Sequence, residues 1–251
     1  MTLQACADIV AKGDPDRFMA AMAAPVAARS VLFPLYAFNV EVARAPWVAS
    51  EPMIGEMRLQ WWRDVLEEIS EGKNVRRHEV ATPLSNVLDK GGAEALDKLV
   101  QRRRWDLYQE PFEDAEHFQS YLAAGGFLMW TAARLLGAEL RAVPKVMAFG
   151  QASALARFLI AVPELEARGR IPLIDGRSEA VRNLAKEALV AMPGWGELKL
   201  VVPRGARPAL LEGWQTLRLL EMVMADPTRV AEGRLGQSEF RKRASLFLKA
   251  L

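Results

Sequence analysis

Four carboxylates at helical spacing form the densest group of residues in the chain that could do chemistry. Asp64, Glu67, Glu68 and Glu71 recur every three or four positions, which places them on one face of a helix. Such a group could coordinate a magnesium ion through its carboxylate oxygens. The opposite face of the same segment is apolar and includes Trp62. The pattern therefore favours the solvated face of an amphipathic helix over a metal site.

Other residue types that commonly carry catalysis or bind metals are scarce. The chain has one cysteine, Cys6, so an internal disulfide and a thiolate zinc site are both excluded. Its two histidines, His78 and His117, do not form a metal-ligand spacing, and no Ser, His and Asp arrangement can be assembled from the sequence. We therefore predict no metal site.

Charge argues against a nucleic-acid partner. Lys and Arg total 33 against 31 acidic residues, for a net charge of +2, whereas nucleic-acid binders carry a concentrated basic footprint. Three short basic clusters, at residues 76–78, 102–104 and 241–243, are predicted to be solvated helix faces. Attraction to an anionic membrane surface stays open as an alternative for them.

The sequence also bears on location. The first residues lack the basic start and apolar run of a secretory signal. No stretch reaches the roughly 18 uninterrupted apolar residues of a membrane span, since charges such as Glu41, Arg134 and Arg157 interrupt each candidate. We expect a cytoplasmic protein, either free or peripheral to a membrane.

Helical periodicity dominates the elements that must position these residues. Apolar side chains recur at three- and four-residue steps in segments 58–69, 118–136, 146–162 and 209–224. Asp14-Pro15 is typical of a helix start, and Gly72, Gly91-Gly92, Gly137 and Gly233 are typical of helix ends. No sustained alternation demands a sheet. We predict an all-α fold with one domain spanning residues 1–251.

One segment reads as irregular. Residues 192–208 are rich in proline and glycine, and the short apolar run 198–202 within them has a β-like composition. We expect this segment to be a loop and the most flexible connection in the chain.

Four segments, in order along the chain, resemble the squalene/phytoene synthases. Residues 29–44 resemble the first core helix of that family, and residues 55–64 its tryptophan-bearing helix. Residues 121–137 are similar to its tyrosine- and glycine-rich central helix, and residues 150–155 with 168–173 to its second motif helix and the turn after it. The resemblance covers the chain from Arg17 onward. It implies a helical bundle around a central apolar cavity.

The resemblance also implies a chemistry, the head-to-head condensation of two prenyl diphosphates, for which the family uses magnesium held by two aspartate-rich stretches. At those positions this chain keeps only the isolated carboxylates Glu41 and Glu164, and no aspartate lies between Asp114 and Asp175. A multiply charged diphosphate in an apolar cavity needs several compensating charges. We therefore expect the condensation to be lost and no cofactor to be bound.

Ligand-contact residues follow from the same resemblance. Arg168 and Arg170 are candidates for contacts with an anionic head group, although an ion pair with Glu164 or Glu166 is favoured. The residues predicted to line a ligand pocket are Tyr36, Asn39, Tyr121, Gly125, Met129, Gln151 and Leu155.

Two functional hypotheses remain, besides a scaffold whose core is filled. In the first, the protein is a non-catalytic relative that binds an isoprenoid or lipid chain, assists respiratory complex assembly, or does both. It then resembles the degenerate members of the family, such as the mitochondrial complex I assembly factor. In the second, it is an active prenyl diphosphate-condensing transferase with an atypical magnesium site on Glu41, Glu164 and either Asp64 or Glu68.

Overall fold

The computed structural model describes residues 2–48 and 51–250, and within these ranges every regular element is a helix. The α-helices are α1 (Leu3–Gly13), α2 (Pro15–Ala23), α3 (Val26–Val48), α4 (Pro52–Ser70), α5 (Ala81–Ser85), α6 (Lys90–Arg102), α7 (Ala115–Leu135), α8 (Val143–Ala167), α9 (Ser178–Ala191), α10 (Trp195–Val201), α11 (Thr216–Ala225), α12 (Thr228–Ala231) and α13 (Glu239–Ala250). Short 3₁₀ helices are η1 (Arg103–Leu107), η2 (Leu140–Ala142) and η3 (Arg204–Gly213). The predicted all-α class is confirmed.

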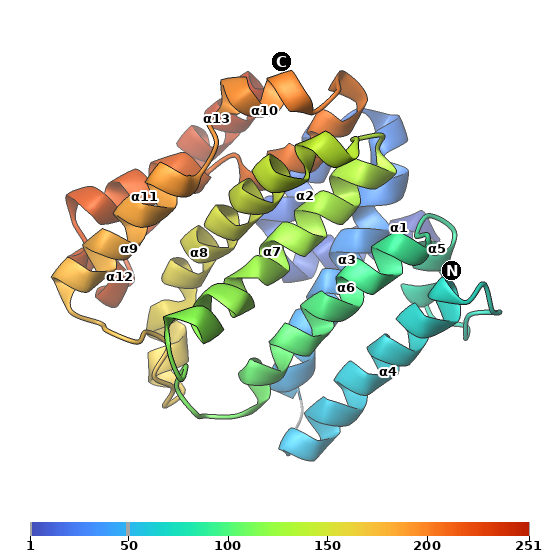
Figure 1. The fold of residues 1–251 in the computed structure, drawn as a ribbon, viewed down its shortest axis with the longest axis horizontal. Helices are drawn as coiled ribbons and strands as arrows, with labels where there is room; N and C mark the ends of the chain where they lie inside the picture. Colours follow the sequence, from blue (N-terminus) through green and yellow to red (C-terminus); the bar gives the residue numbers. More distant parts are fainter. Residues whose placement is uncertain (1, 49–50, 251) are drawn as a thin grey trace.

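The helices form a bundle whose long members run side by side (Figure 1). α4, α6, α7 and α8 are neighbours in that order, and α3 lies behind them against α1, α4 and α7. α9 and α11 pack together along the outer side of α8. The architecture is the helical bundle that the sequence predicts; the extent of the domain, residues 1–251, stays a prediction.

Small residues bring α7 and α8 into close contact at the centre of the bundle. A Cβ atom on Gly125 would lie 2.6 Å from the carbonyl oxygen of Gly150, and one on Gly150 would lie 2.7 Å from the carbonyl oxygen of Gly125. Glycine is therefore required on both sides of this helix crossing, because no side chain fits between the two backbones. The small residues of segment 121–137 thus have a packing role.

Helix ends mostly follow the sequence signals. Asp14 caps α2, with its side chain accepting a hydrogen bond from the backbone N–H of Arg17 at 2.9 Å. Gly72, Gly137 and Gly233 adopt positive φ angles just after helices, as predicted. The same prediction is wrong for Gly91 and Gly92, which lie in the first turn of α6, where the Asp89 side chain accepts a hydrogen bond from the backbone N–H of Gly92 at 2.9 Å.

The predicted flexible connection at residues 192–208 is wrong. The segment contains α10 and the start of η3, and Leu198, Val202 and Ala206 are buried in the core. Leu198 lies on α10, Val202 lies at its end and Ala206 lies on η3, and all three pack into the main hydrophobic core. A short apolar run fits a strand or a buried helical turn equally well, and here the tertiary contact decides.

In the part of the chain that the structure describes, two segments are long and apolar enough to cross a membrane, α3 and residues 140–167 with α8. More than half of each lies inside the bundle, 61% and 56% of the most apolar window. Both have the character of the core helices of a helical bundle, which are apolar on most sides because neighbours surround them.

Candidate functional site

A cavity of about 530 Å³ lies between α3, α7 and α8, and residues of α2 and η1 complete its wall. We call it the central cavity. Small side chains, among them Ala43, Ala124, Ala154 and Ala161, line it where the three long helices meet. Because these side chains do not reach across the junction, space remains between the helices. The volume lies within the roughly 300–1,000 Å³ of typical small-molecule sites.

One side of the central cavity is built from a charged network around Asp14. The Asp14 carboxylate accepts hydrogen bonds from Arg17 Nη1 at 2.6 Å and from Arg157 Nη1 at 3.2 Å. Arg17 also forms an ion pair with Glu212, which is fully buried on η3. Arg157 donates a further bond to the backbone oxygen of Glu212 at 2.9 Å. Two arginines thus face two carboxylates, and we call the group the Asp14 network.

Protonation follows from this pairing. Burial raises the pKa of Asp14, but Arg157 and Arg17 outweigh burial and hold that pKa well below its ordinary value. Burial lowers the pKa of Arg17, but Glu212 and Asp14 outweigh it and raise that pKa above its ordinary value. Asp14 and Arg17 are therefore both charged, and the network pairs two arginines with two carboxylates.

A second charged group lies on η1 and α7, and we call it the Tyr121 network. The Tyr121 hydroxyl donates a hydrogen bond to Asp106 Oδ1 at 2.9 Å and accepts one from Arg103 Nη1 at 2.6 Å. Arg103 Nη1 also pairs with Asp106 Oδ2 at 3.2 Å. Burial raises the pKa of Tyr121, so the phenol stays protonated. Arg103 Nε is buried without a hydrogen-bond partner among the described residues, which leaves one donor unused beside the cavity.

Comparison with known proteins decides the family. A model of the squalene/phytoene synthase family matches residues 10–174, well over half of the chain. The chain belongs to the squalene/phytoene synthase family. A crystal structure of a dehydrosqualene synthase in complex with ligand has the same fold, with a TM-score of 0.76, 18% identity, and coverage of 98% of this chain and 94% of that one.

Curated relatives carry a different kind of name. The chain is 26% identical over 170 residues to human NADH dehydrogenase (ubiquinone) complex I assembly factor 6. The aligned region covers 66% of this chain and 51% of that protein. It is 26% identical over 197 residues to the Drosophila melanogaster homolog of the same factor, covering 74% of the chain and 58% of that protein. The chain thus spans about half the length of the curated relatives it matches.

The magnesium of the squalene/phytoene synthases does not fit this cavity. Of the described lining residues, the carboxylates are Asp14 and Asp106, and arginines hold both of them. Magnesium requires several free oxygen ligands in near-octahedral geometry. Across residues 2–48 and 51–250, no group of three or more His, Cys, Asp or Glu side chains could hold a metal ion.

Glu41 and Glu164 do not line the central cavity. They are the two carboxylates at the positions where the resemblance places the family's acidic motifs. Glu41 lies in a small pocket on another side of α3, beside Trp61 and Trp62, and pairs with Arg44 at 3.3 Å. Glu164 is exposed near the end of α8 and pairs with Arg168 at 2.6 Å.

The acidic face of α4 is solvated, as the sequence analysis favours. The Asp64 carboxylate accepts a hydrogen bond from Gln60 at 2.8 Å, and Glu68 is paired with Arg76. Arg76 thus pairs with Glu68 and, at 3.9 Å, with Asp64, and neither carboxylate is among the lining residues of the central cavity.

The two arginines proposed for an anionic head group also lie away from the cavity lining. Arg168 pairs with Glu164, as the favoured alternative predicts, and its guanidinium lies 4.7 Å from the ring centroid of Trp47. Arg170 is buried and donates to the backbone oxygens of Trp105 at 2.7 Å and Asp106 at 3.0 Å. Both guanidinium groups are therefore engaged by groups of the protein itself, and the arginines that line the cavity are different ones.

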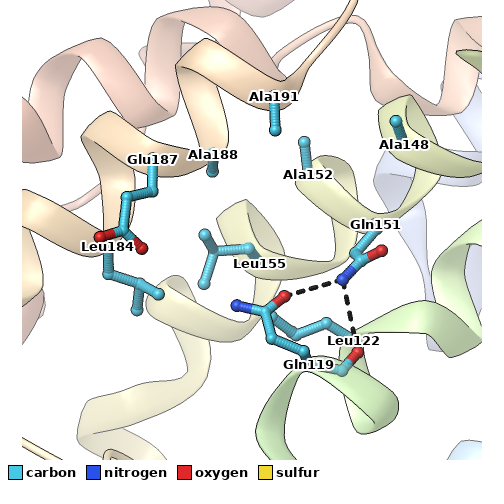
Figure 2. Close-up of a pocket in the computed structure, with 10 residues that line it drawn as sticks. All are labelled: Gln119, Leu122, Ala148, Gln151, Ala152, Leu155, Leu184, Glu187, Ala188 and Ala191. Carbon is cyan, nitrogen blue, oxygen red and sulfur yellow. Dashed lines mark hydrogen bonds between the residues drawn. The ribbon is translucent and has the colours of Figure 1, made fainter. Parts of the chain in front are cut away.

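The seven predicted pocket residues fall into three places. Asn39, Tyr121 and Gly125 line the central cavity. Gln151 and Leu155 instead line a smaller side pocket of about 180 Å³ between α7, α8 and α9 (Figure 2). In that pocket Gln151 Nε2 donates to Gln119 Oε1 at 2.7 Å.

The other two predicted pocket residues belong to the core. Tyr36 and Met129 are fully buried and line neither pocket. Tyr36 nevertheless adjoins the Asp14 network, with the Arg17 guanidinium 5.7 Å from its ring centroid. Burial and the nearby Glu212 raise its pKa, so the Tyr36 phenol stays protonated.

Sequence reasoning missed the charged residues that the cavity uses. In the sequence alone Asp14 indicates a helix cap, and Arg103 belongs to a basic cluster that is predicted to be solvated. Arg157 interrupts an apolar segment. That interruption is the one available signal, because a charge amid a buried apolar helix requires a partner.

Proposed function

We propose that this chain is a non-condensing member of the squalene/phytoene synthase family that assists the assembly of respiratory complex I. One observation carries the first part: arginines neutralise every described carboxylate on the wall of the central cavity. A condensing enzyme has to stabilise a departing diphosphate through metal ions. Here the carboxylates that could bind those ions already form ion pairs.

Two features support an assembly role. The curated relatives over this region are named as complex I assembly factors. In addition, the chain keeps a folded cavity without the family's metal ligands, so a binding role fits it better than a catalytic one.

We further propose that the protein lies in the cytoplasm or at the periphery of the membrane, and that it binds no cofactor and no nucleic acid.

The central cavity suits an amphiphile with one anionic group. Its small and apolar lining would hold an isoprenoid or acyl chain, and the unused Arg103 Nε would face the head group. Native mass spectrometry of the purified protein is expected to detect such a co-purified lipid. Arg103→Met is expected to lower its occupancy, and an empty, ligand-free protein would contradict this part of the proposal.

An assay of condensation tests the central point. The purified protein is incubated with farnesyl or geranylgeranyl diphosphate and magnesium, and released pyrophosphate and hydrocarbon product are measured. We expect neither. Turnover that Glu41→Gln and Glu164→Gln abolish would establish the atypical transferase instead.

A deletion strain tests the assembly role. We expect loss of the gene to lower the level of assembled complex I, and the wild-type gene to restore it. The Glu41→Gln, Glu164→Gln double variant is expected to restore it equally, because neither carboxylate is needed. Normal complex I in the deletion strain would refute the assembly role while leaving the absence of condensation intact.

A further inference from the structure

Helix α13 directs charged side chains toward the rest of the protein and large apolar side chains toward solvent, the reverse of an ordinary surface helix. Its inward side carries lysines: Lys242 Nζ pairs with Asp16 at 3.1 Å, and Lys249 Nζ lies 4.9 Å from the ring centroid of Trp195. Leu246 is its one buried apolar residue within the described part of the chain. Surface helices normally bury their apolar side and expose their charges.

The outer side of α13 carries the large apolar residues. Phe240, Phe247 and Leu248 are 81%, 64% and 71% exposed. At 100° per residue they form one continuous stripe along the helix, with Arg243 on one edge and Arg241 on the other. We call this stripe with its two arginines the outer face of α13.

The neighbouring element extends the same character. α10 lies beside α13 at the upper end of the bundle (Figure 1), and the contact between Lys249 and Trp195 joins the two helices. α10 presents Leu200, which is also largely exposed, next to the exposed Lys199. The acidic residues of these helices are engaged, Glu239 with Lys242 and Glu197 with Lys145. The exposed charge beside the apolar stripe is therefore basic.

We propose that the outer face of α13, together with Leu200, docks on an anionic phospholipid membrane, an inference that rests on the membrane-peripheral location proposed above. A lipid surface fits both halves of the pattern: phenylalanines enter the acyl boundary, and arginines on the two edges reach lipid phosphates. A symmetric contact with a second copy of the chain would gather Arg241 and Arg243 of both copies around one apolar interface, where their like charges repel. Helix α13 then lies in the plane of the interface.

A vesicle sedimentation assay on the full chain tests this surface. The wild-type protein is expected to bind phosphatidylcholine vesicles that contain phosphatidylglycerol, and to bind pure phosphatidylcholine more weakly. Phe240→Ser with Phe247→Ser should weaken binding at least about tenfold, because the apolar insertion is lost. Arg241→Gln with Arg243→Gln should weaken binding to the anionic vesicles about fivefold for each arginine removed.

A matched control distinguishes vesicle binding through this face from nonspecific binding through exposed apolar residues elsewhere. Met53 and Met57 on α4 are 71% and 68% exposed, and α4 lies across the bundle from α13 (Figure 1), so Met53→Ser with Met57→Ser should bind like wild type. Circular dichroism checks that each variant folds. Failure of the wild type to bind anionic vesicles, or undiminished binding by the phenylalanine variant, would overturn the proposal. It would also be overturned if the phenylalanine variant changed the oligomeric state in solution instead of vesicle binding.

Discussion

Replacing Arg17 with methionine removes the cation that holds two buried carboxylates. The side chain of Arg17 is 10% exposed, and those of its partners Asp14 and Glu212 are 15% and 1% exposed. Breaking a buried ion pair by removing one partner costs about 3–5 kcal/mol, because the remaining charge stays uncompensated. Arg157 still reaches Asp14 at 3.2 Å, so the cost arises mainly at Glu212. We expect a loss of about 3 kcal/mol.

Urea unfolding at neutral pH measures this loss as a shift of the midpoint at constant slope. The control is Arg44→Met, which breaks an ion pair with Glu41 whose arginine is 55% exposed and should cost less than about 1 kcal/mol. Adding Glu212→Gln to Arg17→Met should recover part of the loss, since the unpaired charge is gone. A cost for Arg17→Met as small as that of the control would refute the account of the Asp14 network.

The pH dependence gives an independent check with a defined sign. In the wild type the pKa of Asp14 is lowered by folding, so its contribution is present above the ordinary carboxylate pKa and is lost as the pH falls. In Arg17→Met an uncompensated buried carboxylate has a raised pKa, so protonation at low pH relieves it. The difference in stability between wild type and variant should therefore shrink between about pH 7 and pH 4. A constant difference would contradict the electrostatic origin.

Three further predictions concern other parts of the bundle. Gly150→Ala would place a Cβ 2.7 Å from a carbonyl oxygen of α7 and should destabilise the protein by about 2 kcal/mol in thermal unfolding. The control Gly176→Ala, whose Cβ would have no atom within 4 Å, should be neutral, and equal effects of the two variants would contradict the helix-crossing argument. A hydrogen bond from Arg134 lowers the pKa of Asp89 to about 2, so Arg134→Gln should return it toward about 3.9 in a carboxyl NMR titration, and an unchanged value would be evidence against this cause. Burial raises the pKa of Cys6 to about 11, so a thiol reagent at pH 8 should react only after unfolding, and rapid reaction in the folded state would disprove the burial.

Local sequence patterns were sufficient for the long helices. The i, i+3, i+4 spacing in segment 118–136 matches α7, and its glycines are where α8 approaches most closely. The same reasoning failed at residues 198–202, because a short apolar run does not distinguish a strand from one buried helical turn. There the contact with the core, which is not local, selects α10.

The charged wall of the cavity lay beyond local pattern reasoning. Asp14, Arg157 and Glu212 come from distant parts of the chain, and no spacing in the sequence links them. The orientation of α13 had the same limit: its sequence carries both lysines and phenylalanines, and only packing against Asp16 and Trp195 determines which set faces outward. In both cases the decisive interactions are tertiary contacts of charged side chains, namely ion pairs and, for α13, a cation–π contact as well.

Calorimetric titration with a hydrolysis-resistant farnesyl diphosphate analogue, in the presence and absence of magnesium, tests the central claim most directly. Because arginines already neutralise the described carboxylates on the cavity wall, magnesium should not strengthen binding of the analogue. A magnesium-dependent gain in affinity of tenfold or more, about 1.4 kcal/mol, would mean that the cavity assembles a metal–diphosphate site and would contradict the account.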